Sequence, residues 1–164
     1  RLEIHGGSIR IHATPPGAEP VRESVRSLLA EESKWVDNSE SYASFGTRVE
    51  NLQKTLVGLL EKLKSDGKRV AVYGASAKGS TLLNFFGIGK DQIDYVVDRS
   101  TVKQGHYTPG THLKIYDPER LTEDQPDYCL LLTWNFAEEI LQQQQQFRDQ
   151  GGQFIIPIPE VRVA

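Results

Sequence analysis

Apolar residues follow two different periodicities along this chain. Between residues 41 and 65 they recur at alternating intervals of three and four, which predicts one long amphipathic helix. Beyond residue 67, short apolar runs of strand length alternate with turn residues and helix-like segments, at 70–74, 93–97, 113–116, 128–132 and 154–156. Strands separated by crossover segments pair in parallel, so the pattern predicts an α/β domain. We expect a small, mostly parallel sheet of about five strands with flanking helices. One of these helices is expected to be capped by Asn135, with Glu138 three residues on, and to carry its apolar residues from Phe136 to Phe147.

The segment before the long helix has a weaker pattern. Residues 2–13 alternate weakly between apolar and polar positions, which predicts a short strand or hairpin arm that ends at the turn residues 14–17. Residues 19–32 carry apolar side chains at helical spacing and predict a short amphipathic helix. We therefore expect three regions: a strand arm left over from a preceding domain (1–16), a helical connector that includes the long helix (17–66), and a nucleotide-binding domain (67–164).

A glycine-containing turn follows the first predicted strand. Residues 74–79 read G-A-S-A-K-G, one residue away from the dinucleotide fingerprint G-x-G-x-x-G, and a helix-like segment comes next. Small residues at such a turn let a phosphate reach the backbone N–H groups of the helix N-terminus. Asp98 ends the second strand, 19 residues after Gly79, where a Rossmann unit hydrogen-bonds a ribose. The pattern predicts a Rossmann-like domain that binds a nucleotide or another anion at the carboxyl ends of its strands.

Two departures from known motifs leave other interpretations of the turn open. Ser76 replaces the second glycine of the fingerprint, which makes a full NAD site less favoured. A P-loop needs lysine directly after its second glycine, but Ser80 stands there and Lys78 comes two positions early. The alternative interpretation is that Gly74 and Gly79 only permit a tight strand-to-helix turn and close packing, with no ligand.

Composition narrows the class of protein. The net charge of −3 over 164 residues is negative, whereas a protein that binds nucleic acid or an anionic membrane usually carries an excess of positive charge. We therefore expect neither as a partner. The single cysteine, Cys129, argues against a disulfide framework or a thiolate zinc site, and it suits a protein of the cytoplasm. We expect no metal ligands in this chain. Because the chain starts at Arg1 and contains no methionine, we expect it to be a piece of a longer protein.

Five blocks of sequence carry a resemblance to a known family. They are HGGSIRIHA (5–13), YGASAKGSTLLNFFGIG (73–89), IDYVVDRSTVKQGHYTPGTHLKI (93–115), TWNF (133–136) and IPIPEV (156–161). Together they resemble the carboxy-terminal third of the sugar C-methyltransferases, enzymes that act on nucleotide-linked keto-deoxysugars. The resemblance spans nearly the whole chain, and five ordered blocks are far more specific than the glycine turn alone.

The resemblance implies that the parent protein is an S-adenosylmethionine-dependent transferase of deoxysugar biosynthesis. In the implied reaction a base removes a proton from the carbon next to the 4-keto group, and the enolate takes the methyl group. The family has an N-terminal zinc module, a central S-adenosylmethionine-binding domain and this domain, which helps to hold the sugar nucleotide, dTDP-linked or similar. The catalytic segment and the zinc cysteines are expected before residue 5. We therefore expect the chain alone to be inactive, with the preceding methyltransferase domain as its partner.

Candidate site residues come from the resemblance and from their loops. The predicted substrate- or nucleotide-binding residues are Gly74, Ala75, Ser76, Lys78, Gly79, Asp98, Arg99, Lys103, His106, Tyr107, Trp134 and Asn135. The last five are placed by loop position alone, whereas Lys78 is expected to pair with a phosphate. No catalytic residue is expected in this chain, except that His5 is a candidate to face the sugar site of the preceding domain. The alternative for His5 is a structural role.

Two other functions remain open at the level of the sequence. An NAD(P)-binding domain of an oxidoreductase is favoured by the spacing of Asp98 and disfavoured by Ser76. A domain that binds no ligand, in which the long helix docks a partner, predicts a dimer that depends on Leu52, Leu56 and Leu59.

Overall fold

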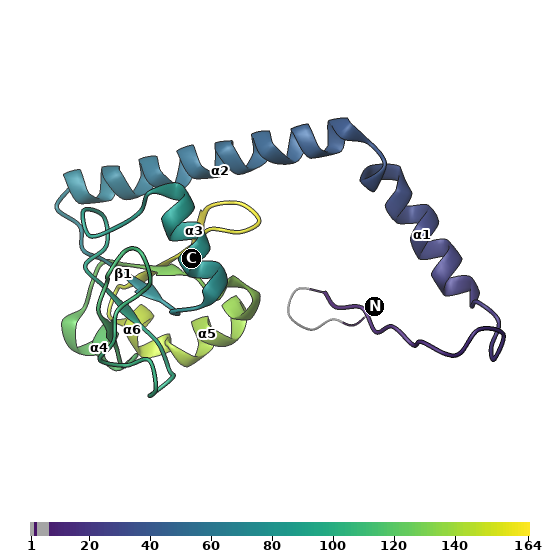
Figure 1. Cartoon of the computed structure of the whole chain (residues 1–164). Coiled ribbons are helices and arrows are strands. Elements are labelled where there is room, and N and C mark those ends of the chain that lie inside the picture. Colours follow the sequence, from purple (N-terminus) through teal and green to yellow (C-terminus); the bar gives the residue numbers. More distant parts are fainter. Residues whose placement is uncertain (1, 3–6) are drawn as a thin grey trace. The chain divides into compact units, whose positions relative to one another are not determined.

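Six strands, counted over the described part of the chain, form one sheet in the order β3-β2-β1-β4-β5-β6 (Figure 1). The computed structural model describes residue 2 and residues 7–164. All pairs from β3 to β5 are parallel, and β5 pairs with β6 antiparallel. The strands are β1 (Val70–Tyr73), β2 (Tyr95–Val97), β3 (Ile115–Tyr116), β4 (Tyr128–Leu131), β5 (Gln153–Ile156) and β6 (Arg162–Val163).

The sheet has the strand order of a Rossmann fold. Its central strands are continuous apolar runs because both of their faces are covered, as the four buried residues of β1 show. The predicted α/β fold with a mostly parallel sheet is confirmed. The short antiparallel strand β6 lies in the carboxy-terminal tail, where no strand was predicted, and its two residues are exposed.

Helices cover both faces of the sheet (Figure 1). On one face, Ala71, Tyr73 and Leu131 belong to a core that includes Ile140 and Phe147 from the helices. Side chains alternate along a strand, so Val70 and its neighbours at alternate positions face the other helical layer. The helices are α1 (Glu23–Val36), α2 (Ser39–Ser65), α3 (Ala77–Phe86), α4 (Arg120–Asp124), α5 (Ala137–Gln143) and α6 (Gln145–Asp149), with a 3₁₀ turn η1 (Trp134–Phe136).

The chain divides into two units, and the division falls inside α2. One unit is Arg1–Asn51, here called the helical unit, and the other is Leu52–Ala164, here called the Rossmann unit. The predicted long helix is confirmed as α2, and the predicted short helix begins and ends four residues later, as α1. The buried residues of α2 all lie in the Rossmann unit: Leu56, Leu60 and Leu63. The proposed boundaries at residues 16 and 66 stay predictions.

Two local predictions are wrong, and the prediction of a short strand or hairpin arm falls partly on residues outside the described ones. Residues 9–13 form no strand, and an isolated antiparallel bridge pairs Leu2 with Ser8. Asn135 does not cap the helix that follows, because it lies within η1 and α5 begins after Phe136 without a side-chain cap. The single helix expected there is interrupted at Gln144 and continues as α6. His5 lies outside the described residues.

Two kinds of feature are absent from the described residues. No helix there is long and apolar enough to cross a membrane. No group of three or more histidine, cysteine, aspartate or glutamate side chains there is placed to hold a metal ion.

Candidate functional site

The glycine turn, residues 74–79, connects β1 to α3 at the carboxyl edge of the sheet. Gly74 has a φ of +99°, a conformation that L side chains rarely adopt. Ser76 is the N-cap of α3, and its hydroxyl accepts a hydrogen bond from the backbone N–H of Gly79 at 3.1 Å. The serine that departs from the dinucleotide fingerprint is therefore used to start the helix.

Both glycines of the turn are required by packing against β4 and the residues that follow it. A Cβ at Gly74 would lie 2.6 Å from Cγ2 of Thr133, and one at Gly79 would lie 2.8 Å from Cβ of Leu132. Neither approach is possible for a larger residue without movement of the strand or the helix. The packing interpretation of these two glycines is therefore sufficient to explain them, whether or not a ligand binds at the turn.

Asp98, directly after β2, is tied to the glycine turn. One carboxylate oxygen accepts hydrogen bonds from the backbone N–H of Ala75 at 2.7 Å and from Nζ of Lys103 at 3.2 Å. The other accepts the backbone N–H of Ser100 at 2.8 Å. The residue is 9% exposed. The Asp98 carboxylate thus accepts the backbone N–H of Ala75, a donor that would bind the phosphate of a dinucleotide in a Rossmann turn.

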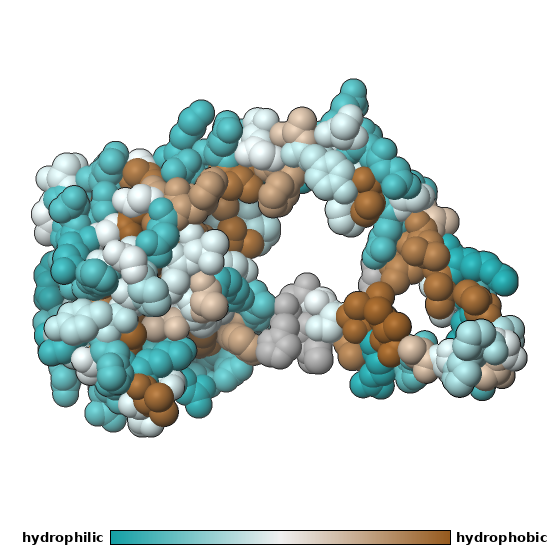
Figure 2. Space-filling view, in the orientation of Figure 1, coloured by the Kyte–Doolittle hydropathy of each residue, from teal (hydrophilic) through white to brown (hydrophobic). Residues whose placement is uncertain are grey.

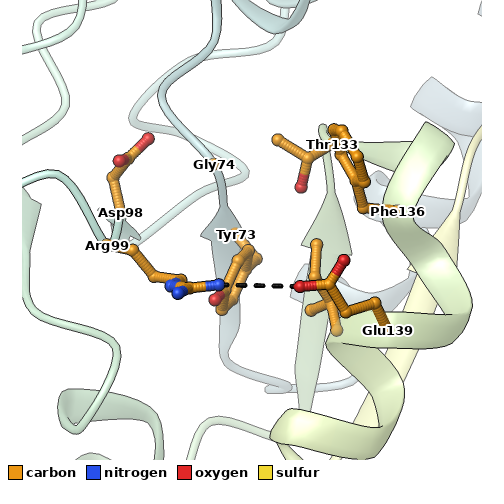
Figure 3. Close-up of a pocket in the computed structure, with 8 residues that line it drawn as sticks. Tyr73, Gly74, Asp98, Arg99, Thr133, Phe136 and Glu139 are labelled. Carbon is orange, nitrogen blue, oxygen red and sulfur yellow. Dashed lines mark ion pairs between the residues drawn. The ribbon is translucent and has the colours of Figure 1, made fainter. Parts of the chain in front are cut away.

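A cavity of about 230 Å³ lies on the α5 side of this edge (Figure 3). It is bounded by the ends of β1 and β2, the segment after β4, and the first turn of α5. The lining residues are Tyr73, Gly74, Asp98, Arg99, Thr133, Phe136, Glu139 and Ile140. We call it the switch-point cavity, because the strand order reverses at β1. The chain adds β2 and β3 on one side of β1 and then β4 and β5 on the other side.

An ion pair crosses the switch-point cavity. The guanidinium of Arg99 lies 3.7 Å from a carboxylate oxygen of Glu139, and it donates a hydrogen bond to Oε1 of Gln143 at 3.3 Å. Figure 3 shows Arg99 and Glu139 pointing toward each other, with Asp98 directed elsewhere. Both members of the pair are more than half exposed. Such exposed pairs contribute little free energy, so Arg99 is able to exchange partners.

Two hydroxyl groups of the switch-point cavity have no hydrogen-bond partner. The Tyr73 hydroxyl and Oγ1 of Thr133 are both inaccessible to solvent and unpaired. The Tyr73 side chain, at the end of β1, is only 3% exposed, and burial raises the pKa of its hydroxyl. A buried polar atom without a partner is uncommon in native proteins. These hydroxyls lie just beneath the cavity surface, so a polar group that enters the cavity reaches them only when the two side chains rotate toward it.

Comparison with known proteins places the chain in a family. Residues 3–159 match the family described as the C-methyltransferase C-terminal domain. The chain belongs to that family.

Individual proteins extend this comparison. The C-methyltransferase NovU of Streptomyces niveus is 42% identical over 163 residues, which are 98% of this chain and 39% of NovU. The chain thus spans well under half of that relative's length. Among solved structures, the crystal structure of UDP-D-quinovosamine 4-dehydrogenase from Vibrio fischeri is similar to this chain with a TM-score of 0.42 and 22% identity. That similarity covers 57% of this chain and 79% of the dehydrogenase chain.

In this C-methyltransferase C-terminal domain, only part of the predicted site gathers at the cavity. Among the predicted residues, Gly74, Asp98 and Arg99 line it. Ala75, Ser76 and Gly79 form the turn beside it, where their polar atoms are engaged in the bonds described above.

The remaining predicted residues lie away from the cavity lining. Nζ of Lys78 lies 4.3 Å from the centre of the Trp134 ring, and burial lowers the pKa of Lys78. Lys103 contacts Asp98 and the carbonyl of Ala75. The loop residues His106 and Tyr107, and Asn135 in η1, are exposed and do not line the cavity.

Four lining residues with functional groups or rings are not among the predicted site residues. In the sequence, Tyr73 is one aromatic residue of a buried strand and Glu139 is one polar residue of a helix-like segment. Thr133 was expected at the carboxyl edge of the sheet without a role in binding, and Phe136 follows the predicted Trp134 and Asn135. Their place in the sequence could have indicated them, because residues at the carboxyl ends of neighbouring parallel strands come close together in the fold.

Proposed function

We propose that this domain holds the nucleotide-linked deoxysugar substrate of an S-adenosylmethionine-dependent sugar C-methyltransferase. Membership of the C-methyltransferase C-terminal domain family supports the general role. The observation that carries the finer proposal is the switch-point cavity, with buried unpaired hydroxyls inside and an exchangeable guanidinium at its edge. Open α/β sheets bind their ligands in this crevice outside the carboxyl ends of the strands.

Charge and hydrogen bonding favour a nucleoside diphosphate over a dinucleotide. The guanidinium of Arg99 presents a planar set of donors that fits phosphate oxygens in pairs. The turn that holds the pyrophosphate of NAD in a Rossmann domain is occupied here by the carboxylate of Asp98. An anionic ligand is therefore better placed beside Arg99 than against the backbone N–H of Ala75.

The chemistry of the full-length protein requires groups outside this chain. S-Adenosylmethionine, bound by the preceding domain, supplies the methyl group, and zinc belongs to an N-terminal module of the same protein. A base that lies outside this chain takes the proton from the carbon next to the keto group of the substrate. The enolate carbon then forms a bond to the methyl group as the sulfur–methyl bond breaks and its electron pair stays on sulfur. In this proposal the present domain binds and orients the substrate and has no activity alone.

The helical unit is the proposed contact with the preceding methyltransferase domain. No described residue of this unit is buried, and Figure 2 shows hydrophobic side chains on its surface. Its exposed large hydrophobic residues are Ile9, Ile11, Val21, Val25, Leu29, Trp35, Val36, Tyr42 and Phe45. Such a concentration of exposed apolar side chains is typical of a surface that another protein part covers. A cavity of about 420 Å³, lined by Trp35, Tyr42, Phe45 and Arg48 with two serines, lies within this unit.

A cytoplasmic location is part of the same proposal. The single cysteine, Cys129, is fully buried and unpaired, as expected for a protein of a reducing compartment. Burial raises the pKa of its thiol well above the ordinary range, so the group is unreactive in the folded chain.

Calorimetry tests the substrate class. The chain is titrated in parallel with dTDP, UDP, NADH and S-adenosylmethionine. Binding of dTDP or UDP alone is the expected result. Binding of NADH would instead assign the domain to an oxidoreductase, and the absence of any dTDP or UDP binding would contradict the proposed role of the cavity.

Sedimentation tests the proposed contact. The chain is mixed with the separately expressed preceding domain of its parent protein, and formation of a complex is measured. We expect Phe45→Asp to weaken the complex at least about tenfold, because a charge replaces an exposed aromatic ring at the contact. Val102→Asp is the control, since Val102 is also an exposed apolar residue but lies in the Rossmann unit. Equal effects of both variants would remove the helical unit from the contact.

A further inference from the structure

We propose that Glu139 is a built-in competitor for Arg99, and that a nucleoside diphosphate binds by taking Arg99 from Glu139 and placing its uncharged base between Tyr73, Thr133 and Phe136. This inference rests on the proposed function and deepens it. It assigns the orientation of the ligand in the switch-point cavity and names residues that read its base.

The interior of the cavity has the chemistry of a site for a neutral ring. Tyr73 and Thr133 each contribute a hydroxyl without a partner, and a hydroxyl both donates and accepts. Phe136 and Ile140 supply apolar surface beside them. A pyrimidine base offers a flat apolar face together with carbonyl acceptors and a ring N–H. When the base enters and the two side chains rotate toward it, the buried hydroxyls gain the partners that the protein does not provide.

The edge of the cavity has the chemistry of a site for an anion. Arg99 is its only cationic side chain among the described lining residues. At 3.7 Å, its contact with Glu139 is longer than a charge-assisted hydrogen bond, and both side chains are largely exposed. A diphosphate carries at least two negative charges against one on the carboxylate, and its oxygens accept two parallel hydrogen bonds from one guanidinium. The exchange of Glu139 for phosphate therefore favours the ligand.

These two halves fix the direction of the ligand. The base lies inside, the diphosphate lies at Arg99, and the sugar attached to the second phosphate extends out of the cavity. The reacting sugar is thus presented beyond the surface of this domain, where another domain is able to reach it. An arrangement with the sugar inside would bury the reacting carbon against Tyr73.

Titration calorimetry with dTDP, thymidine and inorganic pyrophosphate tests this assignment. Tyr73→Phe and Thr133→Val each remove one hydroxyl and keep the shape of the side chain. We expect each to weaken dTDP and thymidine binding by roughly three- to tenfold and to leave pyrophosphate binding unchanged. Tyr128→Phe, at the opposite end of β4, is the control for loss of a tyrosine hydroxyl and should change nothing.

Glu139→Gln tests the competition separately and does not disturb the core. Removal of its charge frees Arg99 and removes a repulsion, so we expect binding of dTDP and of pyrophosphate to tighten by roughly two- to fivefold. Thymidine, which carries no charge, should bind as before. The matched control is Glu138→Gln, because Glu138 lies in the same first turn of α5 and does not line the cavity.

The outcomes separate this inference from the proposed function. If dTDP binds the wild-type chain but Tyr73→Phe, Thr133→Val and Glu139→Gln leave its affinity unchanged, the assignment of the cavity is wrong and the substrate class stands. If neither dTDP nor UDP binds, both are wrong. If Glu139→Gln changes the affinity for thymidine as much as the affinity for pyrophosphate, the proposed orientation of the ligand is wrong.

Discussion

The helical unit and the Rossmann unit differ in burial much more than in sequence pattern. Both contain amphipathic helices, and α2 runs through the boundary between them. Every buried residue of the described chain lies in the Rossmann unit, whereas Trp35 and Phe45 of the helical unit are 54% and 59% exposed. An apolar stripe on a helix therefore shows that the helix has a face to cover, but it does not show what covers it.

The α2 helix shows this difference within one element. Toward its carboxyl end, Leu56 and Leu60 are completely buried in the Rossmann unit. At its amino end, the same stripe continues with Tyr42 and Phe45, which are exposed. The stabilising packing is thus confined to one part of the helix. Mutations along the chain should reveal two regions with very different sensitivity.

The largest expected contrast is between two aromatic residues, one in each unit. Phe154 is fully buried on β5, with its ring 5.4 Å from that of Phe147. Phe154→Ala should lower the free energy of unfolding by about 3–5 kcal/mol, because it leaves a cavity in the core. Trp35→Ala should change it by less than about 0.5 kcal/mol. Urea denaturation followed by circular dichroism measures both. A comparable loss for Trp35→Ala would mean that the helical unit has a core of its own.

Two glycines sharpen the contrast, because the same substitution should act in opposite directions. Gly79→Ala brings a Cβ to within 2.8 Å of Leu132 and should destabilise the Rossmann unit by about 1–3 kcal/mol. Gly46, in α2 of the helical unit, has no atom within 4 Å of an added Cβ. Gly46→Ala should raise helix stability by about 0.5–1 kcal/mol. Thermal unfolding and helical ellipticity report the two effects, and a neutral or stabilising effect of Gly79→Ala would contradict the packing at Gly79.

A smaller effect concerns the loss of stability at acid pH. Asp127 accepts hydrogen bonds from the backbone N–H of Arg69 and from Nζ of Lys68, both at 2.9 Å, and these two groups hold the pKa of Asp127 below its ordinary value of 3.8. A depressed carboxylate pKa contributes stability that is present above the ordinary value and is lost as the pH falls through the folded-state value. Asp127→Asn should cost about 1 kcal/mol at neutral pH, and the difference from wild type should shrink below about pH 4.

The control for the acid experiment lies in the helical unit. Asp37 is exposed at the end of α1, so Asp37→Asn should leave the free energy of unfolding unchanged at each pH. Unfolding in urea between pH 3 and pH 7 gives all three curves. A difference between Asp127→Asn and wild type that grows as the pH falls would show that the sign of this account is wrong.

Much of the fold follows from periodicity alone. The seven-residue pattern predicts α2, and the apolar runs predict the five strands β1 to β5, because burial on both faces removes polar residues from a parallel sheet. The interruption at Gln144 was not predictable, since glutamines surround it on both sides. Residues 9–13 alternate weakly but have no neighbouring strand to pair with in the described structure, and a strand without a partner is not stable.

The candidate site was less predictable than the fold. The glycine turn and Asp98 were found from spacing, but their contacts with Thr133 and Ala75 depend on how β1, β2 and β4 come together. Tyr73 shows the limit most clearly. In the sequence it is one aromatic residue in a buried strand, and only its place at the end of β1 turns its hydroxyl into a feature of a cavity.

Mapping of dTDP binding by NMR tests the central claim most directly. Amide chemical shifts of the isotopically labelled chain are recorded during titration with dTDP. The account predicts saturable shifts centred on Gly74, Arg99, Thr133 and Phe136, with the helical unit unchanged. Shifts centred on residues of the helical unit, or no shift at the switch-point cavity while dTDP binds elsewhere, would contradict it.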